Sequence, residues 1–95
     1  MMSLKLILSH PFVKVTRKIE RNEQKTLEQE HDLKLYEDRI IVGQDQFAIQ
    51  DVFDMSYRFQ STLYGFLYLH TNRGVVTFII KKDPTVFINE YRKLI

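Results

Sequence analysis

The C-terminal half of the chain has the clearest alternation of apolar and polar residues. Three apolar stretches follow one another closely, FAIQDVFDMSYRF, LYGFLYLH and VVTFII. They are rich in β-branched and aromatic residues, as strands usually are. In residues 51–59 the alternation has a period of two, which predicts that the odd-numbered side chains from Phe53 to Phe59 face a core.

Turn residues divide this pattern into hairpins. The segments LKLY and RIIV are separated by two residues, a connection of hairpin length. The apolar runs within residues 64–80 meet at Thr71-Asn72-Arg73-Gly74. Gly74 stands where a type I turn with a bulge needs a left-handed residue. We therefore expect antiparallel neighbours at both places.

At Asp83 the period changes from two to about 3.6, which predicts a helix. Asp83 can accept hydrogen bonds from the first-turn amides, and Pro84 fits the first helical position because its missing N–H costs nothing there. The apolar residues that follow form one stripe: Phe87, Ile88, Tyr91, Leu94 and Ile95. We expect a helix from about Pro84 to Leu94 that covers the sheet; lying on a membrane surface is the alternative.

The N-terminal third differs in composition, because residues 14–32 are mostly charged or amide side chains. The sparse apolar positions favour an edge strand over about residues 11–19, followed by a mobile loop. A solvent-exposed helix over residues 16–30 is the alternative, although it has only Ile19 and Leu27 to bury.

These elements predict an α+β fold, a curved antiparallel sheet or partly open barrel closed by one C-terminal helix. The chain of 95 residues is expected to be one domain, since division would leave pieces near the roughly 40 residues that can bury a core unaided. Residues 1–32 form its polar strand and loop region. With 44% apolar and 27% charged residues, the composition is that of a globular protein.

The order of elements over residues 33–95 resembles that of a bacterial pleckstrin-homology-like domain. In that family the middle strand often begins with an element such as Ile49-Gln50-Asp51-Val52, and the last helix often carries a pair such as Phe87-Ile88. The resemblance implies a scaffold that binds proteins or membrane surfaces, and it implies no catalytic activity. Because one fold hosts many functions, the function has to be argued from a site.

Composition excludes several kinds of chemistry. The chain has no cysteine, so it forms neither disulfides nor thiolate metal sites. A net charge of +2 is too small to indicate nucleic-acid binding. Three scattered glycines cannot cradle a phosphate, and we expect no cofactor. The short apolar run near the N-terminus is neither a signal sequence nor a membrane span, so we expect a cytoplasmic protein.

The first candidate site is a basic cluster, which consists of Lys14, Arg17, Lys18, Arg21 and Lys25. Eukaryotic members of the superfamily bind inositol phosphates on the corresponding strand and loop, so the resemblance implies an anionic membrane surface as a ligand. Four glutamates are interleaved with these cations. A solvated polar edge that prevents strand-to-strand aggregation is therefore the favoured interpretation.

The second candidate site is aromatic. One face of the strand from residue 64 to residue 70 carries Tyr64, Phe66 and Tyr68, while Leu67 and Leu69 lie on the other. Either the twist of the sheet buries both faces, or the aromatic face contacts a protein partner or a second copy of the chain.

Histidines offer little catalytic or metal chemistry. The residues Glu30, His31 and Asp32 are adjacent, so we interpret them as a polar turn rather than a metal site. His70 ends a strand, where a backbone hydrogen bond is more common than a role as catalytic base. The sequence predicts a non-enzymatic binding module, with a protein partner or self-association favoured over a membrane and an enzyme as the third alternative.

Overall fold

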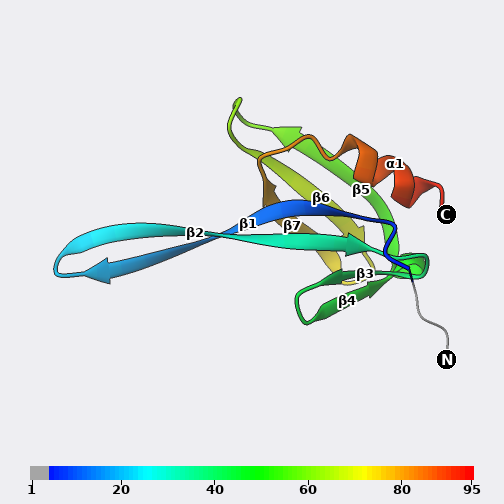
Figure 1. The fold of residues 1–95 in the computed structure, drawn as a ribbon, viewed down its shortest axis with the longest axis horizontal. Helices are drawn as coiled ribbons and strands as arrows, with labels where there is room; N and C mark the ends of the chain where they lie inside the picture. The colour runs from blue at the N-terminus through cyan, green and yellow to red at the C-terminus, as the bar shows by residue number, and fades with distance from the viewer. Residues whose placement is uncertain (1–4) are drawn as a thin grey trace.

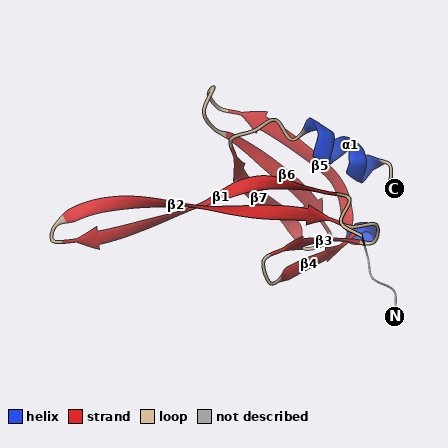
Figure 2. Ribbon diagram, in the orientation of Figure 1, coloured by secondary structure: helices blue, strands red, loops and turns tan. Residues whose placement is uncertain are grey.

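The computed structural model describes residues 5–95, which form a seven-stranded antiparallel sheet and one C-terminal helix (Figures 1 and 2). The strand order is β4-β3-β2-β1-β7-β6-β5, and the sheet does not close on itself. The strands are β1 (Leu8–Glu20), β2 (Glu23–Leu35), β3 (Arg39–Val42), β4 (Asp45–Ala48), β5 (Val52–Phe59), β6 (Gly65–Thr71) and β7 (Gly74–Ile80). A 3₁₀ turn, η1 (Ile49–Asp51), joins β4 to β5, and the helix is α1 (Thr85–Arg92). The α+β class is confirmed.

The core lies on the inner face of the curved sheet, under α1. Inward side chains from both halves of the sheet meet there, among them Leu33, Ile40, Leu67 and Ile80, which are fully buried. The helix adds Phe87, Ile88 and Tyr91, and the Tyr91 hydroxyl donates a hydrogen bond to the Val52 carbonyl. Because this bond joins the helix to β5, α1 is fixed beside the last strand of the sheet, as Figure 1 shows.

The expected C-terminal hairpin and helix are confirmed. Strands β6 and β7 are paired along their whole length, with Gly65 opposite Ile80 at one end and Thr71 opposite Gly74 at the other. Gly74 has a φ of 111°. That backbone conformation is one that glycine adopts without strain. The Asp83 carboxylate accepts the Thr85 amide at 2.8 Å, so it caps the first turn as predicted, with Pro84 immediately before the helix.

The strand expected over about residues 11–19 is confirmed as part of β1, although it lies between β2 and β7 rather than at the edge of the sheet. The mobile loop expected after it, and the alternative helix over residues 16–30, were wrong. Strands β1 and β2 pair along their whole length of 13 residues each. The turn between them uses positive φ at Arg21 and Asn22, 50° and 64°, which suits the right-handed twist of a hairpin. No glycine marks this turn in the sequence, and asparagine tolerates the conformation better than most residues. The triplet Glu30-His31-Asp32, interpreted as a turn, lies inside β2.

The outer half of this hairpin projects from the body of the molecule as an arm, residues 14–29 (Figure 1). All its side chains are exposed. The radius of gyration is 15.0 Å, whereas a compact domain of this length has one of about 12 Å. The arm therefore makes the molecule elongated without adding to its core.

The single strand predicted over FAIQDVFDMSYRF is broken into two strands. Ile49 is buried in the 3₁₀ turn between them, and β4 and β5 lie at opposite edges of the sheet. A bulge between Val52 and Asp54 then shifts the alternation, so that Val52 and Met55 point inwards. Phe53 is 64% exposed, which corrects the expectation that every odd-numbered side chain of residues 51–59 faces the core.

Replacing Phe87 with alanine tests whether α1 holds the sheet together. The Phe87 ring is fully buried beneath the sheet. We expect Phe87→Ala to lower the free energy of unfolding by about 3 to 5 kcal/mol, since the loss of a buried ring leaves a cavity. Denaturant titration measures the change, which is a large part of the roughly 5 to 15 kcal/mol typical of natural proteins.

Val86 provides the matched control, because it precedes Phe87 on the same helix but is 67% exposed. Val86→Ala should change stability by less than about 0.5 kcal/mol. Equal effects of the two substitutions would show that α1 does not close the core.

Candidate functional site

The predicted aromatic face lies on the outer side of the sheet. In β6, Leu67 and Leu69 are fully buried, and the alternate side chains Phe66 and Tyr68 point outwards and are partly exposed. Their ring centroids are 6.3 Å apart. Tyr64 lies in the loop before β6 rather than in the strand, and it is 39% exposed. The structure thus brings the three predicted residues to one surface.

Aliphatic side chains extend this surface across two more strands. Phe66 lies opposite Ile79 of β7, and Ile79 in turn faces Val13 of β1. Val75 is exposed on the same face of β7, and Val15, which is 40% exposed, lies two residues beyond Val13. We call this surface the outer apolar patch: Val15, Tyr64, Phe66, Tyr68, Val75 and Ile79. The sequence had indicated only its aromatic members.

Tyr64 is held in place by a cluster of three side chains that are distant in sequence. Its hydroxyl donates to Oε1 of Glu28 at 2.9 Å, and Nζ of Lys81 donates to Oε2 of the same carboxylate at 2.6 Å. The Lys81 ammonium also lies 5.6 Å from the centre of the Tyr64 ring. Glu28 belongs to the arm, so this cluster ties the arm to the edge of the outer apolar patch.

The three groups shift one another's pKa. Hydrogen bonds from Lys81 and Tyr64 lower the pKa of the Glu28 carboxyl. The hydrogen bond to Glu28 raises the pKa of the Tyr64 phenol, and the same carboxylate raises that of the Lys81 ammonium. The ion pair and the neutral phenol therefore coexist at neutral pH. Glu28 and Lys81 were missed by sequence reasoning, since they are separated by 53 positions and share no motif.

The predicted basic cluster is spread over the arm. In the β1–β2 register Lys18 lies opposite Lys25, so these two side chains share a face with Lys14. Arg17 projects from the other face, and Arg21 is at the turn. Glutamates lie among them, and Lys25 pairs with Glu20 at 3.6 Å. The structure therefore does not gather the five cations into one basic surface.

The histidines occupy separate positions. His70 Nε2 lies 2.9 Å from the Ser56 hydroxyl on the outer face, rather than bonding to the backbone as expected. His10 is buried beside Phe87 and hydrogen-bonds the Lys82 carbonyl, and burial lowers its pKa. His31 stacks on Phe12 with ring centroids 5.6 Å apart. Within residues 5–95 no three histidine or carboxylate side chains come together as metal ligands would.

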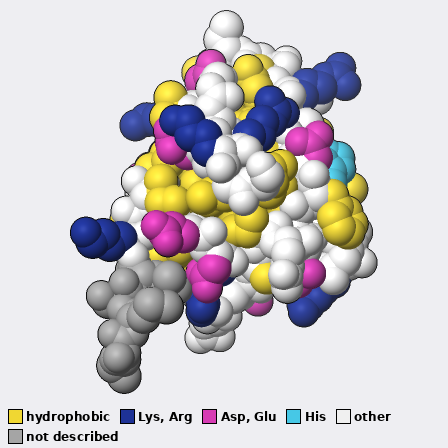
Figure 3. Space-filling view, turned by 90° about the vertical axis from the view of Figure 1, so that its right-hand side faces the viewer, with side chains coloured by type: hydrophobic (Ala, Val, Ile, Leu, Met, Phe, Trp, Pro, Cys, Tyr) yellow, Lys and Arg dark blue, Asp and Glu magenta, His cyan; other side chains and the backbone are white. Residues whose placement is uncertain are grey.

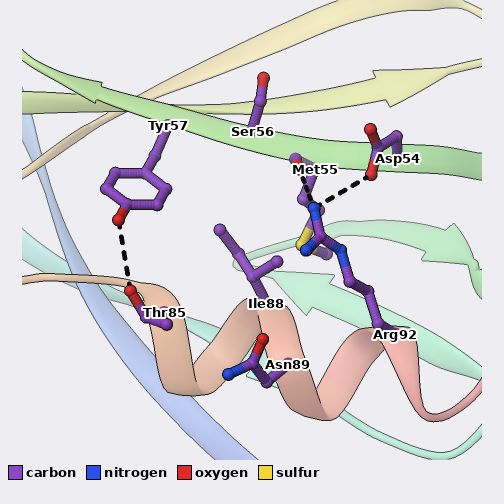
Figure 4. A pocket seen from close by; sticks show the side chains of 8 residues that line it. All are labelled: Asp54, Met55, Ser56, Tyr57, Thr85, Ile88, Asn89 and Arg92. Carbon is purple, nitrogen blue, oxygen red and sulfur yellow. Dashed lines mark hydrogen bonds and ion pairs between the residues drawn. The ribbon is translucent and has the colours of Figure 1, made fainter.

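A groove between β5 and α1, shown in Figure 4, was not expected from the sequence. Across it, Nη2 of Arg92 lies 3.5 Å from the Met55 carbonyl and 3.7 Å from the Asp54 carboxylate. The hydroxyls of Tyr57 and Thr85 are 3.4 Å apart. Its volume is about 270 Å³, below the usual range of roughly 300 to 1,000 Å³ for ligand sites. Side chains of the protein bridge the groove, so the outer apolar patch is the stronger candidate.

A second hollow lies beside the end of α1. Figure 3 views the molecule from this side, where hydrophobic side chains gather between charged ones. Ile49, Leu94 and Ile95 are among the residues that line a hollow of about 540 Å³ there. Its apolar lining comes from η1 and from the segment after α1.

Comparison with protein-family models, curated proteins and solved structures finds no match to this chain. In the described part of the chain, no helix is long and apolar enough to cross a bilayer.

The link between Glu28 and Tyr64 is testable by titration. We expect Glu28→Gln to lower the raised pKa of Tyr64 towards the ordinary value of about 10, because the hydrogen bond to a carboxylate and its negative charge are both removed. The Cζ chemical shift of Tyr64, followed by NMR against pH, reports this change. Glu30→Gln is the control, since Glu30 lies two positions along β2 and makes no hydrogen bond to Tyr64. A Tyr64 titration unchanged by Glu28→Gln would contradict the geometry.

Proposed function

We propose that this chain is a non-catalytic, pleckstrin-homology-like domain that binds another protein through the outer apolar patch. The exposure of Phe66 and Tyr68 supports this most strongly. The core does not need these rings, because Leu67 and Leu69 fill the inner face of the same strand. Aromatic side chains on a rigid strand are effective anchors, since they bury a large area and have little conformational freedom to lose.

The arrangement of elements is compatible with the pleckstrin-homology-like part of the proposal. Strands β1 to β4 follow one another across one half of the sheet, and β5 to β7 follow one another across the other half. The helix α1 lies beside β5. The sequence resemblance implies the same curved sheet with a C-terminal helix. The proposal takes the fold as a scaffold and assigns binding to its outer face.

The charges around the patch favour a partner with an acidic rim. Arg58 lies opposite Phe66 on the outer face, and it has no ion-pair partner among residues 5–95. Glu28 and Asp54, the nearby carboxylates, are already paired with Lys81 and Arg92. A protein surface with an apolar centre and an acidic rim would complement both features.

Cross-linking from the patch tests this function. A photoreactive phenylalanine analogue replaces Tyr68 in the full chain, produced in its native cells. We expect one cross-linked product of discrete mass, and we expect Phe66→Glu to remove most of it, since a central aromatic anchor contributes about 2 kcal/mol or more.

The same analogue at Gln46 is the matched control, because Gln46 is an exposed strand residue on β4, at the far edge of the sheet. No discrete product from position 68, or the same product from position 46, would overturn the proposal. A product with the mass of two copies would assign the patch to self-association instead.

Binding to an anionic membrane surface is the second candidate function, and the exposure of all five arm cations favours it. Each cation near an anionic bilayer contributes about 1 kcal/mol. Their division between two faces of the arm, together with the interleaved glutamates, makes it the weaker candidate.

Co-sedimentation with acidic vesicles measures membrane binding directly. We expect little pelleting at 0.15 M salt, and no change when Lys14, Arg17 and Lys18 are all replaced by glutamate. Strong pelleting that disappears in this variant and at high salt would favour the membrane over a protein partner.

A further inference from the structure

The arm has an unpaired backbone edge. Strand β1 pairs with β2 along its whole length, but on its other side it meets β7 only at Val13, opposite Ile79. Beyond that bridge, residues 14–20 of β1 have no strand neighbour on this side among the described residues. Their free N–H and C=O groups are a template for pairing with another strand.

The arm is also weakly supported by its own side chains. It contributes nothing to the core, and a two-stranded ribbon by itself is only marginally stable in water. Two of its cross-strand pairs carry like charges, Lys18 opposite Lys25 and Glu20 opposite Glu23. Directly opposed like charges destabilise a sheet. An added strand would supply the backbone and side-chain partners that the arm lacks.

We propose that two copies of this chain associate through residues 14–20 of β1, paired antiparallel about a two-fold axis at Arg17. A two-fold axis perpendicular to the ribbon keeps equivalent faces on the same side, as a closed symmetric dimer requires. The product is a four-stranded ribbon in which β1 of each copy is central and β2 is outermost. The two bodies lie at opposite ends of it.

The side chains of β1 favour this register. It places Lys14 opposite Glu20 of the second copy, and Val15 opposite Ile19 of the second copy. By symmetry each pair occurs twice, so the contact contains two opposite-charge pairs and two aliphatic pairs. Both Val15 and Ile19 are exposed in the single chain, so pairing covers apolar surface.

Neighbouring registers lose these pairs. Only shifts by an even number of residues preserve the faces of the strands. A shift of two residues in one direction brings Lys14 opposite Lys18, and a shift in the other brings Lys18 opposite its own equivalent. The favoured register has one unfavourable feature, Arg17 facing Arg17 at the axis.

The contact leaves the rest of the fold intact. It begins after Val13, so the bridge to Ile79 is kept. Phe66 and Tyr68 lie on β6, two strands away from β1 in the sheet order. This inference therefore does not rest on the proposed function, and Tyr68→Glu should leave the dimer unchanged.

Charge reversal with rescue tests the contact. By sedimentation equilibrium we expect wild-type protein to dimerise, and we expect Lys14→Glu or Glu20→Lys alone to weaken dimerisation about tenfold or more, since each puts like charges together twice. The double variant restores opposite charges and should dimerise as the wild type does.

Lys18→Glu is the matched control, because residue 18 faces Thr16 of the second copy in this register. Lys18→Glu should leave the dimer dissociation constant within about threefold of the wild-type value. If net charge alone controlled dimerisation, Lys18→Glu would weaken it as much as Lys14→Glu does. A monomeric wild type at millimolar concentration, or a double variant that is not rescued, would overturn the proposal.

Disulfide formation reads the register independently, since the chain has no cysteine of its own. Directly opposed residues lie about 4.5 to 5.5 Å apart between Cα atoms, within reach of a disulfide. Arg17→Cys should therefore cross-link to itself on mild oxidation. Thr16→Cys and Lys18→Cys should cross-link to each other when mixed but poorly alone. Equal cross-linking by all single variants would show that the contact has no defined register.

Discussion

Among residues 5–95, a single bridge between Val13 and Ile79 joins the two halves of the sheet. On one side of it β1 to β4 form consecutive hairpins, and on the other β5 to β7 do the same. One bridge cannot hold two halves by backbone hydrogen bonds, so their union depends on the shared core and on α1. Leu33 and Ile40 from one half meet Leu67 and Ile80 from the other beneath the helix. Burial of these side chains is the interaction on which the remaining architecture depends.

The same bridge determines which surfaces are free. Because β1 and β7 separate after it, the arm leaves the body and the edge of β1 is exposed from Lys14 onwards. Because the core occupies only the inner face, the outer side chains of β6 and β7 form a patch that no element of residues 5–95 covers. The proposed binding surface and the proposed self-pairing edge are therefore two consequences of one topology, and they share only Val15 of β1.

Electrostatics connects the arm to the body at one place. Glu28 accepts hydrogen bonds from Tyr64 and Lys81, which come from the loop before β6 and the segment after β7. The three groups are exposed, so solvent screens their interaction and its contribution to stability is small. Its structural effect is larger, since it orients a ring at the margin of the outer apolar patch. Sequence reasoning proposed Tyr64 as a contact residue, but it did not find the two charged groups that position the ring.

The sequence by itself determined the elements whose signals are local. Asp83 and Pro84 mark the helix start, Gly74 supplies the positive φ of the last hairpin, and the alternation in β6 separates Phe66 and Tyr68 from Leu67 and Leu69. These features depend on neighbours a few residues apart, where steric and hydrogen-bond preferences act directly.

Only the tertiary structure decided the rest. The second strand of the arm and its pairing with the first were missed because the arm has few apolar residues and is defined by long-range register, with Arg21 and Asn22 in place of a glycine turn. The break at Ile49 was missed because the chain passes there from β4 at one edge of the sheet to β5 at the other. An apolar run has the same local pattern whether it forms one continuous strand or two strands at opposite edges. The division of the basic residues between two faces likewise follows from the register in which β1 pairs with β2. Pairing partners distant in sequence decide these features, and local residue preferences do not encode them.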